Sequence, residues 1–359
     1  MLFGEISSEE ILYLMLYGGV AMAALLASIY LYLRKGNAFA ADVTPPVRLR
    51  RWAAAFFAVA FWGHLWWYLF AIYSGDIQSV SCVVVAVVDC VSLLTTIAGT
   101  LLAMLQDRKR LVWPIVLAPI PYAVLLVLNI VYPNGQLLNI AITYILLIYV
   151  LFTIYMVFAV RQYGRWLRDN YADLEQKEVW LSHVLVIVIL ILIIGYGFDT
   201  GDLTIAYLVQ LNELILFAFL LWRVETLPQL ESTLVEQRAQ QPMAIPSNIE
   251  QLLTESCVDT QLYLQHDLTL LQLSQAVGTN RTYLSQYFSN HGTTYNAYIN
   301  DLRINHFMRL YRKATDTGQS ITAQQLASNS GYRSYSTFSL AFKQRIGQSV
   351  TAWMRETAK

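Results

Sequence analysis

Three ionisable side chains lie within otherwise apolar stretches of the chain. His64, Asp89 and Glu213 each stand about ten residues from one end of such a stretch, and Gln210 and Asn212 lie close to Glu213. A helix rises ~1.5 Å per residue, so each of the three would lie ~15 Å deep. Ionisable groups at that depth usually face a bundle interior or a cavity. The pattern predicts either a ligand- or proton-sensitive cluster or a set of hydrogen bonds between helices.

No other group of residues predicts catalysis or metal binding. The remaining histidines have no cysteine or carboxylate at ligand spacing: His183, His266, His291 and His306. The cysteines form neither a zinc pattern nor an even disulfide set: Cys82, Cys90 and Cys257. The sequence contains no glycine loop that would cradle a phosphate. We therefore expect a protein that is not an enzyme and uses no cofactor or metal.

Two segments near the C-terminus, Leu268–Phe288 and Ile321–Phe342, repeat one local design. In the first segment, Thr269 can cap a helix while Gln272 reaches back to it, and Gly278 allows the sharp turn after the helix. In the second, Thr322, Gln325 and Gly331 occupy the matching positions. Apolar i, i+4 pairs follow each turn and predict a second helix packed on the first: Leu284 with Phe288, and Phe338 with Phe342. The spacing therefore predicts two helix-turn-helix units.

These segments, with YINDLRI (Tyr298–Ile304) and GYRSYSTFSLAFKQRIG (Gly331–Gly347), resemble the AraC/XylS-type DNA-binding domain. The resemblance covers roughly the last hundred residues of the chain. It implies sequence-specific binding of double-stranded promoter DNA and regulation of transcription, more often activation. It also admits RNA polymerase as a partner.

The resemblance places DNA-facing side chains on the second helix of each unit. They are Arg281, Thr282, Ser285 and Gln286 in the first unit, and Arg333, Tyr335, Ser336 and Ser339 in the second. Glutamine can address adenine and arginine guanine, while serine reads bases weakly. Leu340 occupies a position where that family commonly has arginine. A basic set on the connecting helix either faces phosphates or is solvated: Arg303, Arg309, Arg312 and Lys313.

Composition indicates that much of the rest of the chain is not exposed to water as an ordinary soluble domain is. Of 359 residues, 56% are hydrophobic and 13% are charged, with a formal net charge of zero. A soluble domain carries about a quarter charged residues, so this chain needs either a very large core or a lipid bilayer. Seven apolar segments have the ~20-residue length of a membrane helix: 11–33, 52–73, 80–104, 111–131, 137–160, 180–198 and 203–222. Pro114, Pro119 and Pro121 predict an irregular fourth segment.

Loop charges predict the orientation of these segments. Basic residues gather in alternate connections: Arg34, Lys35, Arg48, Arg50, Arg51, Arg108, Lys109, Arg110, Arg161, Arg165, Arg168 and Lys177. The opposite connections and the N-terminus carry none. The positive-inside rule therefore puts the N-terminus outside and the C-terminus in the cytoplasm. Together with the family resemblance, this predicts a location in the bacterial inner membrane.

The sequence predicts an all-α chain in three parts. Residues 1–223 form a polytopic seven-helix transmembrane bundle, 224–247 a linker, and 248–359 a cytoplasmic double helix-turn-helix domain. Leu227, Leu230 and Leu234 give the linker a short apolar stripe that could pair with a second copy of the chain. We expect a one-component regulator that senses an unknown small molecule or proton. The alternatives are a transporter or membrane enzyme with an appended interaction module, and a passive anchor whose DNA-binding domain is released by proteolysis.

Overall fold

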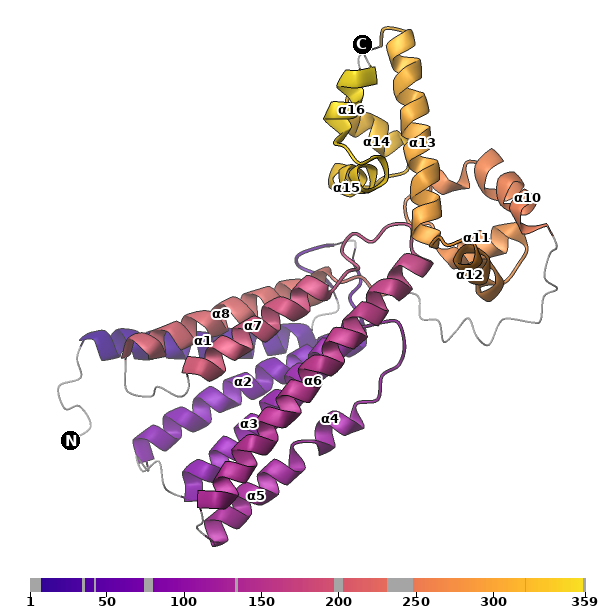
Figure 1. The fold of residues 1–359 in the computed structure, drawn as a ribbon. Coiled ribbons are helices and arrows are strands. Elements are labelled where there is room, and N and C mark those ends of the chain that lie inside the picture. Colours follow the sequence, from indigo (N-terminus) through magenta and orange to yellow (C-terminus); the bar gives the residue numbers. More distant parts are fainter. Residues whose placement is uncertain are drawn as a thin grey trace. The chain divides into compact units, whose positions relative to one another are not determined.

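The computed structural model describes residues 8–33, 36–41, 43–73, 80–132, 135–196, 203–230, 248–319 and 321–357. Within these ranges the protein is helical and contains no strand beyond one isolated bridge, between Tyr171 and Thr269. The chain forms two compact units (Figure 1). The first comprises residues 1–161 and 179–232, and the second comprises 162–178 and 233–359.

The first unit contains the helices of the apolar segments. Their bounds are α1 Ser8–Leu33, α2 Val47–Tyr73, α3 Val80–Ala103, α4 Trp113–Leu117, α5 Ile120–Val131, α6 Gly135–Asn170, α7 Trp180–Tyr196 and α8 Leu203–Thr226. The last residues of α6 belong to the second unit. The prolines divide the fourth segment as expected: α4 has a proline in its first turn, and Pro119 precedes α5.

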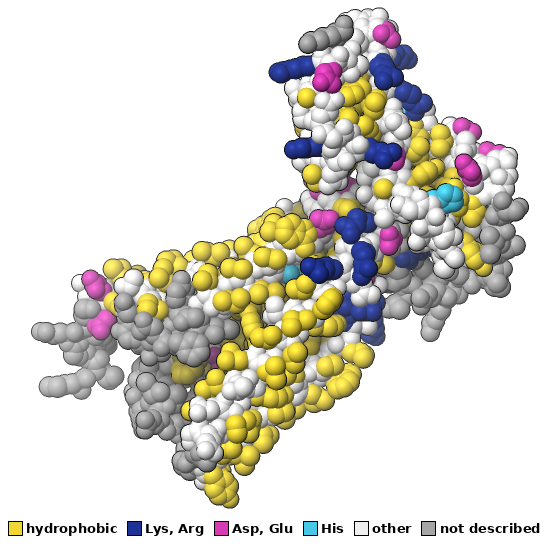
Figure 2. All heavy atoms as spheres, viewed as in Figure 1, with side chains coloured by type: hydrophobic (Ala, Val, Ile, Leu, Met, Phe, Trp, Pro, Cys, Tyr) yellow, Lys and Arg dark blue, Asp and Glu magenta, His cyan; other side chains and the backbone are white. Residues whose placement is uncertain are grey.

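Four helical stretches are long and apolar enough to cross a membrane, counted over the described residues: Ser8–Leu33, Trp113–Val131, Gly135–Asn170 and Leu203–Thr226. Two shorter apolar helices, Val87–Ala103 and Trp180–Leu192, accompany them. The structure thus supports four spans of the seven that the sequence predicts. Hydrophobic side chains cover much of the visible face of this unit (Figure 2).

Buried polar contacts close one end of the first unit. Two Arg110–Asp107 hydrogen bonds of 2.8 Å join side chains that are almost fully buried. The Arg223 guanidinium donates to Ser182 Oγ at 2.9 Å. Glu225 accepts from Tyr30 at 2.9 Å and lies 3.4 Å from Arg50. Several basic residues at this end of the helices are therefore paired inside the protein.

The first residues of the expected linker belong to this packing. Leu227 and Leu230 are buried, and Gln106 forms a 2.9 Å hydrogen bond with the backbone of Leu230 and another with that of Pro228. These two leucines are therefore not available for pairing with a second copy of the chain. Leu234 and the rest of the linker, 231–247, lie outside the described residues.

The second unit consists of short helices arranged around one long helix. They are α10 Ile249–Leu253, η1 Thr254–Asp259, η2 Leu262–Leu264, α11 Leu270–Val277, α12 Arg281–Asn290, α13 Tyr295–Asp316, α14 Ala323–Asn329, α15 Tyr335–Ile346 and α16 Val350–Thr357. Figure 1 shows α10–α12 near the start of α13 and α14–α16 farther along it. Each group has its own apolar core, one around Leu284 and Phe288 and the other around Phe338 and Phe342.

Both predicted capping boxes are confirmed. Thr269 accepts from the Gln272 backbone at 3.2 Å, and the Gln272 side chain accepts from the Thr269 backbone at 2.9 Å. Thr322 and Gln325 form the same pair of bonds before α14. Gly331 has φ +86°, and a Cβ there would lie 2.8 Å from the backbone of Leu264. Only glycine therefore fits this turn without displacing its neighbours.

Candidate nucleic-acid interface and buried polar cluster

The first helix-turn-helix pairs α11 with α12. Asn280 caps α12 by accepting from the Tyr283 backbone at 2.9 Å, and Leu284 and Phe288 anchor the helix in the core. The four predicted DNA-facing residues lie on the remaining surface of α12. Thr282 and Gln286 are exposed, and Arg281 and Ser285 are half-buried.

The second helix-turn-helix pairs α14 with α15 in the same way. Ser334 caps α15 through the backbone of Thr337 at 3.3 Å. Of the four predicted residues, Arg333 and Ser336 are exposed while Tyr335 and Ser339 are half-buried. Leu340 is 61% exposed on the same helix. The candidate surface of the second helix-turn-helix therefore combines hydroxyl groups, one arginine and an apolar side chain of the kind that can contact a thymine methyl group.

Arg303 does not belong to this surface, which corrects the expectation that it faces phosphate or solvent. Its side chain is only 1% exposed and donates to the carbonyls of Tyr263, Gln265 and His266 at 2.8, 2.7 and 3.3 Å. Its guanidinium also lies 5.5 Å from the centre of the Tyr332 ring. Burial lowers the pKa of Arg303, but a guanidinium keeps its charge in proteins. Arg303 therefore ties the loop before α11 to α13 and to the second helix-turn-helix.

The segment between α6 and α7 was not predicted to contact this unit. Ala172 is buried in the core of the first helix-turn-helix, and its N–H donates to Leu268 O at 3.2 Å. The Asn296 amide donates to the carbonyls of Tyr171 and Ala172 at 3.1 and 2.7 Å. Residues 171–178, which we name the docking segment, are thus held by their backbone. The contacts join positions more than a hundred residues apart, so no local sequence pattern could indicate them.

In the first unit, four of the five predicted polar residues come together. His64 Nε2 lies 3.1 Å from Glu213 Oε2 and 3.2 Å from Gln210 Oε1. Asp89 lines the same cavity of about 320 Å³. Asn212 is not part of this cluster: its amide bonds to Leu208 O at 3.0 Å on its own helix. Gln210 and Glu213 share a face of α8 because they are three residues apart, and Asn212 does not share it.

Two aromatic residues complete the cluster and were missed from the sequence. The Tyr17 hydroxyl donates to His64 O at 2.8 Å, and Trp67 Nε1 donates to Asp89 Oδ2 at 3.0 Å. The sequence contains 23 Tyr and 9 Trp, and nothing in its local pattern distinguishes these two.

Both ring nitrogens of His64 have polar partners. Nδ1 is 2.8 Å from Ala60 O, which can only accept, so Nδ1 carries a hydrogen. Nε2 faces Gln210 Oε1 and Glu213 Oε2. Asp89 adds a second carboxyl group to the same cavity.

Replacing Arg303 tests its structural role. Arg303→Met leaves three backbone carbonyl groups, in one buried and two partly buried hydrogen bonds, without their donor, and hydrogen bonds to charged groups contribute ~1.5–3 kcal/mol each. We expect hydrogen exchange to rise at 263–266 and at the start of α11. Arg312→Met, at an exposed position of α13, should leave exchange unchanged; equal exchange in the two variants would contradict the role.

Comparison with known proteins identifies the second unit. Residues 273–356 match the family model described as a helix-turn-helix domain. The match runs from within α11 to within α16; it therefore contains α12 to α15, while the Thr269–Gln272 capping box lies just before it. No curated protein and no solved structure matches the chain. The C-terminal region is a helix-turn-helix domain of the DNA-binding, transcription-regulating kind, in agreement with its resemblance to the AraC type.

Proposed function

We propose that this chain is a membrane-embedded one-component transcription regulator. The observation that carries the proposal is the presence, in one chain, of two capped helix-turn-helix units and a helical unit with a largely apolar exterior. The first part would lie in the bilayer, and the second would bind promoter DNA in the cytoplasm.

The length of α13 supports simultaneous binding of DNA by the two helix-turn-helix motifs. Its 22 residues span ~33 Å, close to the ~34 Å turn of DNA that separates successive major-groove segments on one face. One copy of the domain could therefore place α12 and α15 in neighbouring segments. A homodimer and contact with RNA polymerase remain compatible with this arrangement but are not needed for it.

The apolar unit supports the membrane part of the proposal. Helices occupy all seven apolar segments of the sequence, and we infer that α2, α3 and α7 cross the bilayer together with the four longer apolar stretches. Basic residues in alternate connections favour an external N-terminus and a cytoplasmic C-terminus in the bacterial inner membrane. A transporter would need a polar pathway through the unit, and among the described residues the groups around His64 form a local cluster, so this alternative is less favoured.

The buried cluster supports a sensing role. A carboxyl group in a low-dielectric site is costly when ionised and unpaired, so Asp89 would bind either a proton or a cationic ligand. Both events would change the charge between α2, α3 and α8. The alternative is a purely structural role, in which the cluster only holds these helices together.

DNA binding is tested by selecting duplexes from a random-sequence library with the full chain in lipid nanodiscs. We expect one enriched sequence. Gln286→Ala and Arg333→Ala should each weaken binding to it ~5- to 150-fold, because a well-formed base contact is worth ~1–3 kcal/mol. Asn305→Ala, at an exposed site on α13, should bind like the wild type. Absence of any enriched duplex would refute the proposed function.

Sensing is tested in cells with a reporter gene driven by the selected sequence. Asp89→Asn and Glu213→Gln retain the shape of each side chain but remove its charge. We expect reporter output to lose its response to inducer or external pH, while the amount of membrane-bound protein is unchanged. An unaltered response in both variants would assign the cluster to helix packing alone.

A further inference from the structure

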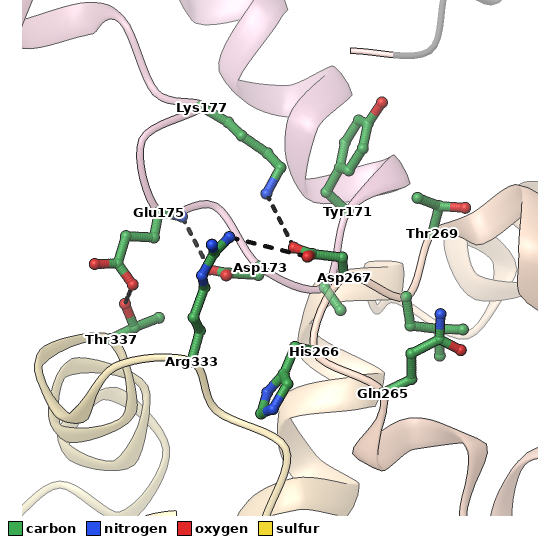
Figure 3. Close-up of polar contacts among 12 residues, drawn as sticks. Tyr171, Asp173, Glu175, Lys177, Gln265, His266, Asp267, Thr269, Arg333 and Thr337 are labelled. Atoms are coloured by element: carbon green, nitrogen blue, oxygen red, sulfur yellow. Dashed lines mark hydrogen bonds and ion pairs between the residues drawn. The ribbon is translucent and has the colours of Figure 1, made fainter. Parts of the chain in front are cut away.

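The docking segment carries acidic groups to the N-terminal end of α15. Figure 3 shows Asp173, Glu175 and Lys177 of this segment beside Asp267, Arg333 and Thr337 of the helix-turn-helix domain. Thr337 Oγ1 donates to Glu175 Oε2 at 3.0 Å. The Glu175 backbone N–H donates to Asp173 Oδ1 at 3.0 Å, which shapes the turn that presents the carboxylate.

A second acidic group lies beside the first. Asp267 Oδ2 is 3.9 Å from Arg333 Nη1, and Asp267 Oδ1 is 3.8 Å from Lys177 Nζ. Asp267 thus lies between a cation of the docking segment and an arginine expected to contact DNA (Figure 3). Both ion pairs are partly exposed, and each is worth little alone. The backbone contacts of Tyr171 and Ala172 supply most of the attachment.

These contacts lie at the N-terminal end of α15, where the candidate DNA surface begins. Arg333 just before the helix pairs with Asp267, and Thr337 in the first turn is three residues from the exposed Leu340, so those two share a helix face. Helix N-termini favour anions because their N–H groups are unpaired and the helix dipole is positive there. The Glu175 carboxylate, held by the Thr337 hydroxyl, lies at this end of the helix and would compete there with a DNA phosphate.

We propose that the docking segment is an autoinhibitory strap that competes with DNA for the N-terminal end of α15. The inference rests on the proposed function, since it concerns the regulation of the same DNA-binding surface. While the strap is docked, a second negative group at α15 would be repelled by Glu175. DNA can therefore bind through both helix-turn-helix motifs only after the strap has dissociated from α15.

The strap is joined covalently to the apolar unit through α6. It follows α6 without a break, and residues 135–161 of that helix belong to the apolar unit. A change in the packing of α6 would therefore alter how tightly residues 171–178 dock. A docked-to-free ratio of ~10 would lower the apparent affinity for DNA ~10-fold. Neither the linker nor a second copy of the chain is needed for this effect.

The strap is tested with the full chain in nanodiscs and the duplex selected by the wild-type protein. Glu175→Ala removes the contact with Thr337, and Asn296→Ala removes two hydrogen bonds to the strap backbone. Both variants should bind the duplex roughly 10-fold more tightly than the wild type. Asp259→Ala, which deletes an exposed carboxylate in η1, controls for charge alone and should change affinity less than ~2-fold.

Hydrogen exchange of the wild-type chain gives an independent readout. The Ala172 amide is bonded to Leu268 O, so it should be protected without DNA and should exchange faster in the DNA complex. If the wild type binds DNA while both variants bind no more tightly and Ala172 stays protected, the strap is refuted and the proposed function stands. If neither wild type nor variants bind any duplex, both proposals fall.

Discussion

The apolar surface of the first unit imposes the constraint on which the rest of the chain depends. Met15, Leu111 and Phe158 expose 68%, 69% and 65% of their surface, and dozens of other large apolar side chains are also exposed. Removing apolar surface from water is worth about 25 cal/mol per Å². A continuous surface of this kind requires a lipid or protein environment. The Arg110–Asp107 and Arg50–Glu225 pairs at one end, and the His64–Glu213 contact within the unit, reduce the cost of placing ionisable groups in apolar surroundings.

The second unit follows the rules of an ordinary aqueous domain. Each of its two small cores contains a helix that begins with a capping box and is followed by a glycine with positive φ. Helix α13 contributes to both cores. Arg303 adds a long-range connection between the two halves, because one guanidinium bonds the loop before α11 and lies over Tyr332 of the second half. This connection helps to fix the spacing of α12 and α15, which the proposed binding to two neighbouring groove segments requires.

The parts that could be predicted from the sequence are those with local causes. Caps, turn glycines and i, i+4 anchors depend on residues a few positions apart, and the structure confirms them. The prediction that His64, Asp89, Gln210 and Glu213 cluster came from their similar depth within apolar helices. The structure places these side chains around one cavity, and their role is untested. Arg303, Tyr17, Trp67 and the strap could not be predicted, because their partners are backbone carbonyls or distant segments. An arginine on an amphipathic helix looks solvated until the loop that buries it is known.

Coupling between the two units would then be covalent and short, through α6 into the strap. The central claim is that the two units of one chain occupy two solvents, and its most direct test is a pair of fusions after Lys359. A fluorescent protein that folds only in the cytoplasm should give signal in the membrane fraction, and an alkaline phosphatase that is active only outside should give none. Phosphatase activity from this fusion, or recovery of the intact chain in the soluble fraction, would contradict the account.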